Sequence, residues 1–405
     1  MNNMKKWIAP FLIWCGLFVL LISNYLTNIM DARNNRLFED FQKDSELLVT
    51  DMLLAERAGL EMGEYGLGFY VEDSEQIDPY QAQYGLQGKI FRHLSVGMPY
   101  DTAVNMLHFL CAAGMAITVL LIVYLIYRKY NLLMAFIFYI TFLLSPWIVN
   151  FARNLYWVEF TWFLPMLIGL YCSYRIHSKN CRIFCYVAGF LTIAAKCLCG
   201  YEYISTIMLG LIAFLLIDFL KSVFEKDFKK SKLLFNTIFI LGIFALLGFI
   251  AALCILGSFR GNGNILDGLQ SIYKEDVLRR TLGGNVNDFP EVYRESLEAP
   301  IFEVLKQYFK FETSIIAGVS GKFFSFLCIV PMIMMAYDGY KKRMNVELVS
   351  MYIIFFITTI SWFVLGKAHS AIHTHMNFVL WYFGLVQICF YIISNWFIKI
   401  LKRER

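Results

Sequence analysis

Charged residues are scarce in this chain. Only 17% of its 405 residues are Asp, Glu, Lys or Arg, and 59% are hydrophobic, whereas a soluble protein carries about 25% charge. The apolar residues form runs of roughly 18 to 25, long enough for a helix to cross a hydrocarbon core of about 30 Å. The composition excludes a soluble enzyme and predicts a membrane protein.

Other patterns are also missing. The alternating segments of about ten residues that build a membrane barrel are absent, so we expect helical spans, because lipid offers the backbone no partners. Residues 1–27 lack the small-residue cleavage site of a signal peptide, and we expect a retained first span there. Most of the ten cysteines lie in apolar runs, where they act as small hydrophobes, and no disulfide framework is expected.

The hydrophobic runs predict an all-α polytopic membrane protein with about ten transmembrane helices. The expected spans are 7–29, 103–127, 131–150, 157–175, 182–199, 202–221, 233–257, 322–338, 347–366 and 375–398. We divide the chain into a transmembrane module (1–257, including a first loop at 30–102), a second loop (258–321) and C-terminal helices (322–405).

The distribution of Lys and Arg predicts the orientation. If the N-terminus is cytoplasmic, every inside segment is basic, from Lys5 and Lys6 to 399–405, as the positive-inside rule requires. Both termini are then cytoplasmic, and the loops 30–102 and 258–321 lie outside a bacterial cell membrane. The formal charge of +5 indicates contact with anionic lipid. We find no basic groove with interleaved aromatics that would favour nucleic acid, and no internal repeat.

The first outside loop concentrates acidic residues beside the membrane. Between Asp31 and Asp101 there are 14 Asp or Glu residues and 6 Lys or Arg residues. Residues 38–60 have the pattern of an amphipathic helix, which can lie on a membrane surface. A general base needs a carboxylate held where water is partly excluded. The candidate catalytic residues are therefore the loop carboxylates Asp44, Glu46 and Asp51.

This arrangement resembles the GT-C superfamily of integral-membrane glycosyltransferases, including the protein mannosyltransferases and the lipid A aminoarabinose transferases. In those enzymes an acidic pair in the first outside loop is followed by an aromatic residue and by an alanine about ten residues on. Here Asp44-Ser45-Glu46 is followed by Leu47 and, further on, Ala55. The acids are separated by Ser45 and the aromatic is replaced.

The resemblance implies a substrate, a reaction and a base. The donor would be a polyprenyl-(pyro)phosphate-linked sugar, and the acceptor a glycan or lipid-linked component of the cell envelope. An Asp would take the proton of the acceptor hydroxyl as its oxygen attacks the anomeric carbon with inversion. Asp44 is the first choice for this base, Glu46 the second and Asp51 the third.

Polar residues gather at the predicted outer ends of later spans. Arg153 is the only basic residue of its short loop, and a forked guanidinium suits phosphate. Lys196 and Glu202 flank the join of the fifth and sixth spans, where ionisable groups are costly and usually functional or paired. Arg279 and Arg280, in the second loop, are further candidates for lipid phosphate.

The last cluster contains Lys367, His369, His373 and His375. His369 and His373 are four residues apart and share a face of a helix. Phosphate recognition by the lysine and the histidines is one interpretation, and plain interfacial polarity is another. A divalent cation at the histidines is a third, although no carboxylate adjoins them in the sequence.

Two other function classes remain open. An O-antigen-type polymerase or ligase uses similar lipids, but its main outside loop usually lies late in the chain. A lipid-linked-sugar transporter or flippase predicts charged or broken spans near the middle of the membrane. Here the ionisable residues crowd the outer ends, and His108 is the main exception.

Overall fold

The computed structural model describes residues 2–61, 63–281, 284–311 and 313–403. Within these residues the chain is almost entirely helical, as predicted, with two small antiparallel hairpins. One hairpin pairs β1 (Gly68–Val71) with β2 (Gln76–Pro79), and the other pairs β3 (Ser314–Ile316) with β4 (Val319–Ser320).

Seven helices of the described chain are long and apolar enough to cross a membrane. They are α1 (Asn2–Thr27), α5 (Tyr100–Lys129), α9 (Lys179–Cys199), α10 (Ile204–Phe224), α11 (Phe228–Arg260), α16 (Phe324–Tyr340, counted with the 3₁₀ residues from Gly321) and α17 (Val346–Leu365). Three shorter apolar helices are α6 (Leu132–Leu144), α8 (Phe160–Tyr174) and α19 (Leu385–Arg403), whose apolar part is Leu385–Leu401. The prediction of a multi-pass membrane protein is confirmed, and each expected span coincides with one of these helices.

Two predicted spans were too long. The span 131–150 breaks at Ser145, because Pro146 disfavours a helical conformation in the residue before it. Ser145 then caps the short helix α7 (Pro146–Phe151) by accepting a hydrogen bond from the Ile148 amide at 3.2 Å. The span 375–398 begins only at Leu385, after the 3₁₀ segment η6 (Asn377–Tyr382).

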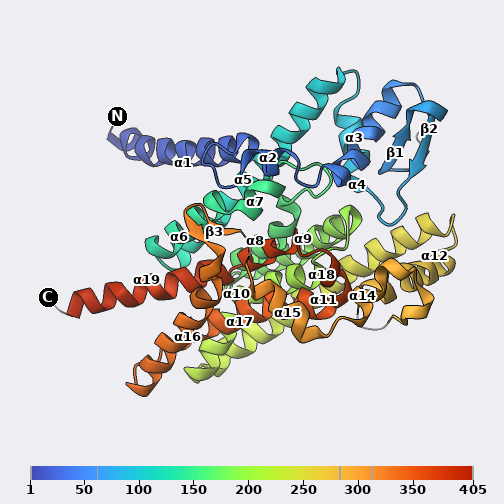
Figure 1. Ribbon diagram of the computed structural model, residues 1–405. Helices are drawn as coiled ribbons and strands as arrows, with labels where there is room; N and C mark the ends of the chain where they lie inside the picture. Colours follow the sequence, from blue (N-terminus) through green and yellow to red (C-terminus); the bar gives the residue numbers. More distant parts are fainter. Residues whose placement is uncertain (1, 62, 282–283, 312, 404–405) are drawn as a thin grey trace.

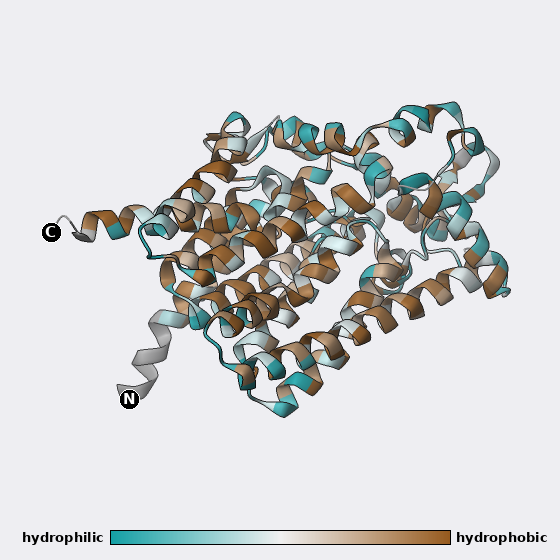
Figure 2. Cartoon of the chain, turned by 90° about the horizontal axis from the view of Figure 1, so that it is seen from below, coloured by the Kyte–Doolittle hydropathy of each residue, from teal (hydrophilic) through white to brown (hydrophobic). Residues whose placement is uncertain are grey.

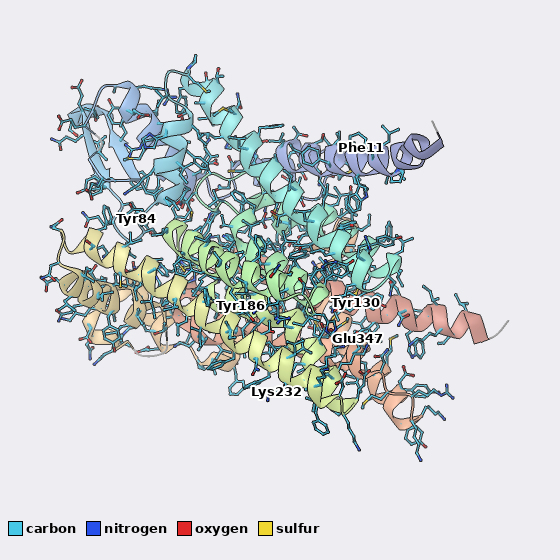
Figure 3. All side chains as sticks on the ribbon, turned by 180° about the vertical axis from the view of Figure 1, so that it is seen from behind. Phe11, Tyr84, Tyr130, Tyr186, Lys232 and Glu347 are labelled. Carbon is cyan, nitrogen blue, oxygen red and sulfur yellow. The ribbon has the colours of Figure 1, made fainter. Side chains whose placement is uncertain are left out.

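The long helices form a bundle with two different ends. Both termini lie toward one end, and β1, β2 and α12 (Ile265–Ile272) lie at the other (Figure 1). Hydrophobic residues dominate the helices between, while hydrophilic residues gather at the end away from the termini (Figure 2). We call the end that carries β1 and β2 the loop end. Figure 3 places Tyr84 at the loop end, with Tyr130 and Glu347 toward the opposite end.

The first loop is more closely packed than predicted. Residues 38–60 form two helices, α2 (Asn35–Glu39) and α3 (Lys43–Arg57), which are separated at Gln42, where φ is +53°. The apolar face of α3 packs on β1, α4 (Leu86–Leu94) and α5. The face that we expected to lie on the membrane is therefore covered by protein, and the catalytic candidates on α3 are held by tertiary contacts.

The second loop is mostly helical and folds back over the bundle. Its other helical elements are the π-helical turn η2 (Tyr273–Val277), α13 (Leu278–Arg280), η3 (Val286–Asp288), η4 (Glu291–Tyr293), α14 (Arg294–Glu298) and α15 (Ile301–Phe309). Helices α13, α14 and α15 contact α18 (Lys367–Ile372), the short helix after α17. The second loop thus packs against the segment that follows α17. A last 3₁₀ turn, η5 (Gly321–Phe323), leads into α16, and another, η1 (Glu72–Ser74), joins β1 to β2.

Gly169 sets the separation of α8 and α10. A Cβ at this position would lie 1.7 Å from the carbonyl oxygen of Leu211, so the helices would have to move apart. We expect Gly169→Ala to lower the free energy of unfolding by about 1–3 kcal/mol through overpacking. Gly242→Ala in α11 is the control, because its Cβ would meet nothing within 4 Å. Unfolding in detergent should separate the two variants, and equal midpoints would contradict this close approach.

Candidate functional site

A polar cavity of about 420 Å³ is lined by residues from the connections between the helices. It is enclosed by the start of α3, the α7–α8 and α9–α10 connections, α13, the segment near Tyr293, and α18 with the residues after it. Its lining residues are Gln42, Asp44, Ser45, Tyr80, Tyr156, Trp157, Glu202, Arg279, Arg280, Tyr293, His369, Ile372, His373, His375 and Met376.

The cavity unites seven of the residues chosen from the sequence. They come from four distant parts of the chain and are Asp44, Glu202, Arg279, Arg280, His369, His373 and His375. Five others line no part of it: Glu46, Asp51, Arg153, Lys196 and Lys367.

The three candidate carboxylates of α3 have different surroundings. Glu46 Oε1 accepts hydrogen bonds from the Leu155 amide at 2.8 Å and from His108 Nε2 at 3.0 Å. Asp51 Oδ2 accepts a hydrogen bond from the Tyr70 amide at 3.3 Å, and Asp51 has at least one further interaction. Asp44 is exposed at the cavity, in the first turn of α3, where the helix dipole favours a negative charge. Only Asp44 is positioned to meet a molecule in the cavity.

The α7–α8 connection builds the aromatic wall. Asn154 Oδ1 accepts hydrogen bonds from the amides of Tyr156 and Trp157 at 3.0 and 3.1 Å. The turn ends at Val158, whose φ is +40°, which is rare for a β-branched residue. Together with the contact from Glu46, these interactions fix the two aromatic side chains at the cavity.

Glu202 and Arg280 form the buried charge pair of the site. Arg280 Nη1 lies 3.1 Å from Glu202 Oε1, and the side chains are 19% and 6% exposed. Gln83 Nε2 also donates to both oxygens of Glu202, at 3.1 and 3.2 Å. A Cβ on Gly200 would lie 2.6 Å from Glu202 Oε2, so glycine at this position leaves room for the carboxylate.

Asp276 joins this pair to two more arginines. Its carboxylate lies 3.2 Å from Arg280 Nη2 and 3.5 Å from Arg279 Nη2, and it is also paired with Arg260. Asp276 belongs to the π-helical turn η2, and such turns often occur at functional sites. Burial alone lowers the pKa of Arg280, but the carboxylates of Glu202 and Asp276 outweigh it and raise that pKa.

The three histidines are adjacent, and burial lowers the pKa of each ring. The ring centroids of His369 and His373 are 4.4 Å apart, and those of His373 and His375 are 5.7 Å apart. Burial, followed by the charge of neighbouring groups, lowers the pKa of His369 well below its usual value and that of His373 to about 4. Among the described residues no cluster of His, Cys, Asp and Glu has the arrangement of a metal site.

The lowered pKa of His373 predicts a pH dependence of stability. Between about pH 6.5 and pH 4 the unfolded chain binds a proton that the folded protein does not, so stability falls as the pH drops. The charged and titratable groups acting on this ring are His375, Glu202, Arg280 and Arg279. We expect His373→Gln to flatten the decline in unfolding midpoint between pH 7 and pH 4.5. An unchanged slope would contradict the assignment.

The remaining predicted cations are occupied by structural contacts. Arg153 pairs with Glu39 at 2.8 Å and donates to the Leu26 carbonyl at 2.9 Å. Lys196 Nζ donates to the Gly200 carbonyl at 2.5 Å. Lys367 Nζ donates to the carbonyls of residues 297 and 299, at 2.6 and 3.0 Å. These side chains join connecting segments to one another and to the helix ends beside them.

Sequence reasoning gave no role to four aromatic residues of the lining. Tyr80, Tyr156, Trp157 and Tyr293 all face the cavity. The sequence offers one partial indication, since Tyr156 and Trp157 follow Arg153 in a short outside connection. Nothing in the sequence around Tyr80 or Tyr293 distinguishes them from other loop tyrosines.

An apolar cavity of about 480 Å³ adjoins the polar one at Arg280, which lines both. Its other walls come from α10, α11, α12, η2 and α17, and include Phe249, Leu253, Leu269 and Trp362. One arginine side chain therefore borders both a hydrophobic and a polar space.

We compared the chain with known protein families, curated proteins and solved structures, and found no match in any of the three.

Proposed function

We propose that this protein is an inverting glycosyltransferase that moves a sugar from a polyprenyl-(pyro)phosphate carrier to a cell-envelope acceptor. The observation that carries the proposal is the pairing of the two cavities. Arg280 lines both a polar space with one accessible carboxylate, Asp44, and an apolar space. The proposed substrate has a sugar, a phosphate and a long hydrocarbon tail, in that order. The sugar would match the polar cavity, the phosphate would match Arg280, and the tail would match the apolar cavity.

The proposed topology has ten spans and both termini in the cytoplasm of a bacterial cell. The location of the termini at the end away from the cavity supports it (Figure 1). The cavity then opens at the outer face of the membrane, beside the lipid leaflet that would deliver the donor. In this orientation the segments rich in Lys and Arg lie on the cytoplasmic side, as the positive-inside rule requires.

Asp44 is the proposed general base. Its carboxylate accepts the proton of the acceptor hydroxyl while that oxygen forms a bond to the anomeric carbon, and the bond from this carbon to the lipid phosphate breaks. The electron pair leaves with the phosphate, which gains negative charge. A base aligned in this way contributes about 10²–10⁴ to the rate.

The arginines are the proposed partners of the leaving phosphate. Arg280 is held between Glu202 and Asp276, and Arg279 donates to Tyr293 Oη at 2.8 Å. Such fixed cations stabilise charge that develops in the transition state without reorganising. Neutral imidazoles of His369 and His373 add hydrogen-bonding capacity but no charge, and Tyr80, Tyr156 and Trp157 form a surface for a sugar ring.

The direct test is transfer by the purified full chain in proteoliposomes. Polyprenyl phosphates that carry different sugars are supplied with envelope glycan acceptors, and release of polyprenyl phosphate is measured. We expect release that requires both donor and acceptor. Movement of the lipid-linked sugar across vesicles that lack any acceptor, without release of the carrier, would favour a transporter and overturn the proposal.

A further inference from the structure

Another cavity lies at the opposite end of the bundle, between α16 and α19. The two helices diverge toward the end that carries the termini (Figure 1). A cavity of about 560 Å³ is lined by residues of both helices. Its lining residues are Val330, Ile333, Met334, Tyr337, Asp338, Arg343, Trp396, Lys399 and Ile400. Most of this wall is aliphatic or aromatic, and the charged residues belong to the last turns of the helices and to the α16–α17 turn.

The cations of this cavity differ from two lysines at the same end that are held by carboxylates. Lys129 is paired with Asp218 at 2.6 Å, and Lys221 with Glu347 at 3.2 Å. Arg343 and Lys399 form no ion pair with any carboxylate of the described chain, although Asp338 also lines the cavity. The site therefore has two cations against one carboxylate, beside an apolar wall.

We propose that this cavity binds an anionic glycerophospholipid of the inner leaflet. An acyl chain fits along Ile333, Met334 and Ile400, and the phosphate lies between Arg343 and Lys399. Basic pockets between transmembrane helices on the cytoplasmic side bind lipid head groups in this way.

Two features favour an anionic lipid over other occupants. A free anion would leave the apolar wall uncovered, and a zwitterionic lipid would bring no net charge to two unpaired cations. Trp396 and Tyr337 lie beside the cations, and aromatic residues with a polar edge are enriched at the level of the head groups. The cavity is separate from the proposed glycosyltransferase site, so this inference does not depend on that function.

Native mass spectrometry of the full chain tests the proposal. The protein is delipidated, equilibrated with equal amounts of phosphatidylglycerol and phosphatidylcholine, and examined for retained lipid. We expect one phosphatidylglycerol per chain, favoured about tenfold or more, since each basic residue near the surface contributes to binding. The double variant Arg343→Gln/Lys399→Gln should lose this preference.

Lys229→Gln/Lys232→Gln is the matched control. It removes two exposed lysines near the start of α11, and we expect it to keep the bound lipid. A second measurement does not need the charge variants. The fluorescence of Trp396 is the part of the emission that Trp396→Phe removes. Brominated phosphatidylglycerol should quench it, and brominated phosphatidylcholine should not. Equal retention of the two lipids, equal loss in both double variants, or a dimer without lipid would overturn the proposal.

Discussion

Asp44→Asn should reduce sugar transfer by about 10³-fold while the protein inserts and folds normally. The amide cannot accept the proton of the attacking hydroxyl, yet it has nearly the same size as the carboxylate. Asp44 is exposed and makes no hydrogen bond or ion pair in the described part of the chain, so its replacement removes no structural contact. The measurement is initial transfer rate in proteoliposomes, with the unfolding midpoint as a check of folding.

Glu46→Ala provides the contrast for this prediction. It leaves the buried Leu155 amide without its 2.8 Å acceptor, and an unsatisfied donor costs about 1–3 kcal/mol. We expect a lower unfolding midpoint together with a partial loss of transfer, because Leu155 precedes the aromatic wall of the cavity. If Asp44→Asn retains the wild-type rate while Glu46→Ala folds normally and loses transfer, Glu46 is the base and our assignment is wrong.

The sequence predicted the helices well because lipid imposes a simple rule. Hydrophobic runs of sufficient length must be helices with their backbone groups paired internally, and the predicted spans coincide with helices. The ends were less accurate where local chemistry intervened, as at Pro146 and in the segment before Leu385. Hydropathy averages over many residues and does not register a single proline or a 3₁₀ turn.

The site was only partly predictable, because its parts meet through tertiary packing. Ionisable groups near the predicted outer ends of spans are usually either functional or paired. This rule identified the candidate residues, but it could not tell those that line the cavity from those held in structural contacts. Glu202 and Arg280 pair with each other and line the cavity, whereas Arg153 and Lys196 are bound to carbonyls or a carboxylate away from it. Which ionisable groups reach the cavity depends on how distant segments pack around them.

The buried pair of Arg280 and Glu202 gives a prediction in which stability and transfer respond differently. Arg280→Gln leaves the nearly buried carboxylate of Glu202 with Gln83 as its hydrogen-bond donor. Removing one partner of such a pair costs about 3–5 kcal/mol, and losing a fixed donor at the phosphate should reduce transfer about 100-fold. Arg294→Gln is the control, because Arg294 is 54% exposed and its ion pairs are at the surface.

The double variant Arg280→Gln/Glu202→Gln separates the structural role from the functional one. The second substitution replaces the unpaired carboxylate with an amide of the same shape, and Gln83 can still donate to the amide oxygen, so most of the lost stability should return. Transfer should stay about 100-fold below wild type, because of the two arginines only Arg279 remains to face the leaving phosphate and the cation fixed between two carboxylates is gone. The two quantities are measured on the same preparations, by unfolding in detergent and by release of polyprenyl phosphate. If transfer recovers together with stability, the guanidinium acts only through folding, and the phosphate must be bound elsewhere in the cavity.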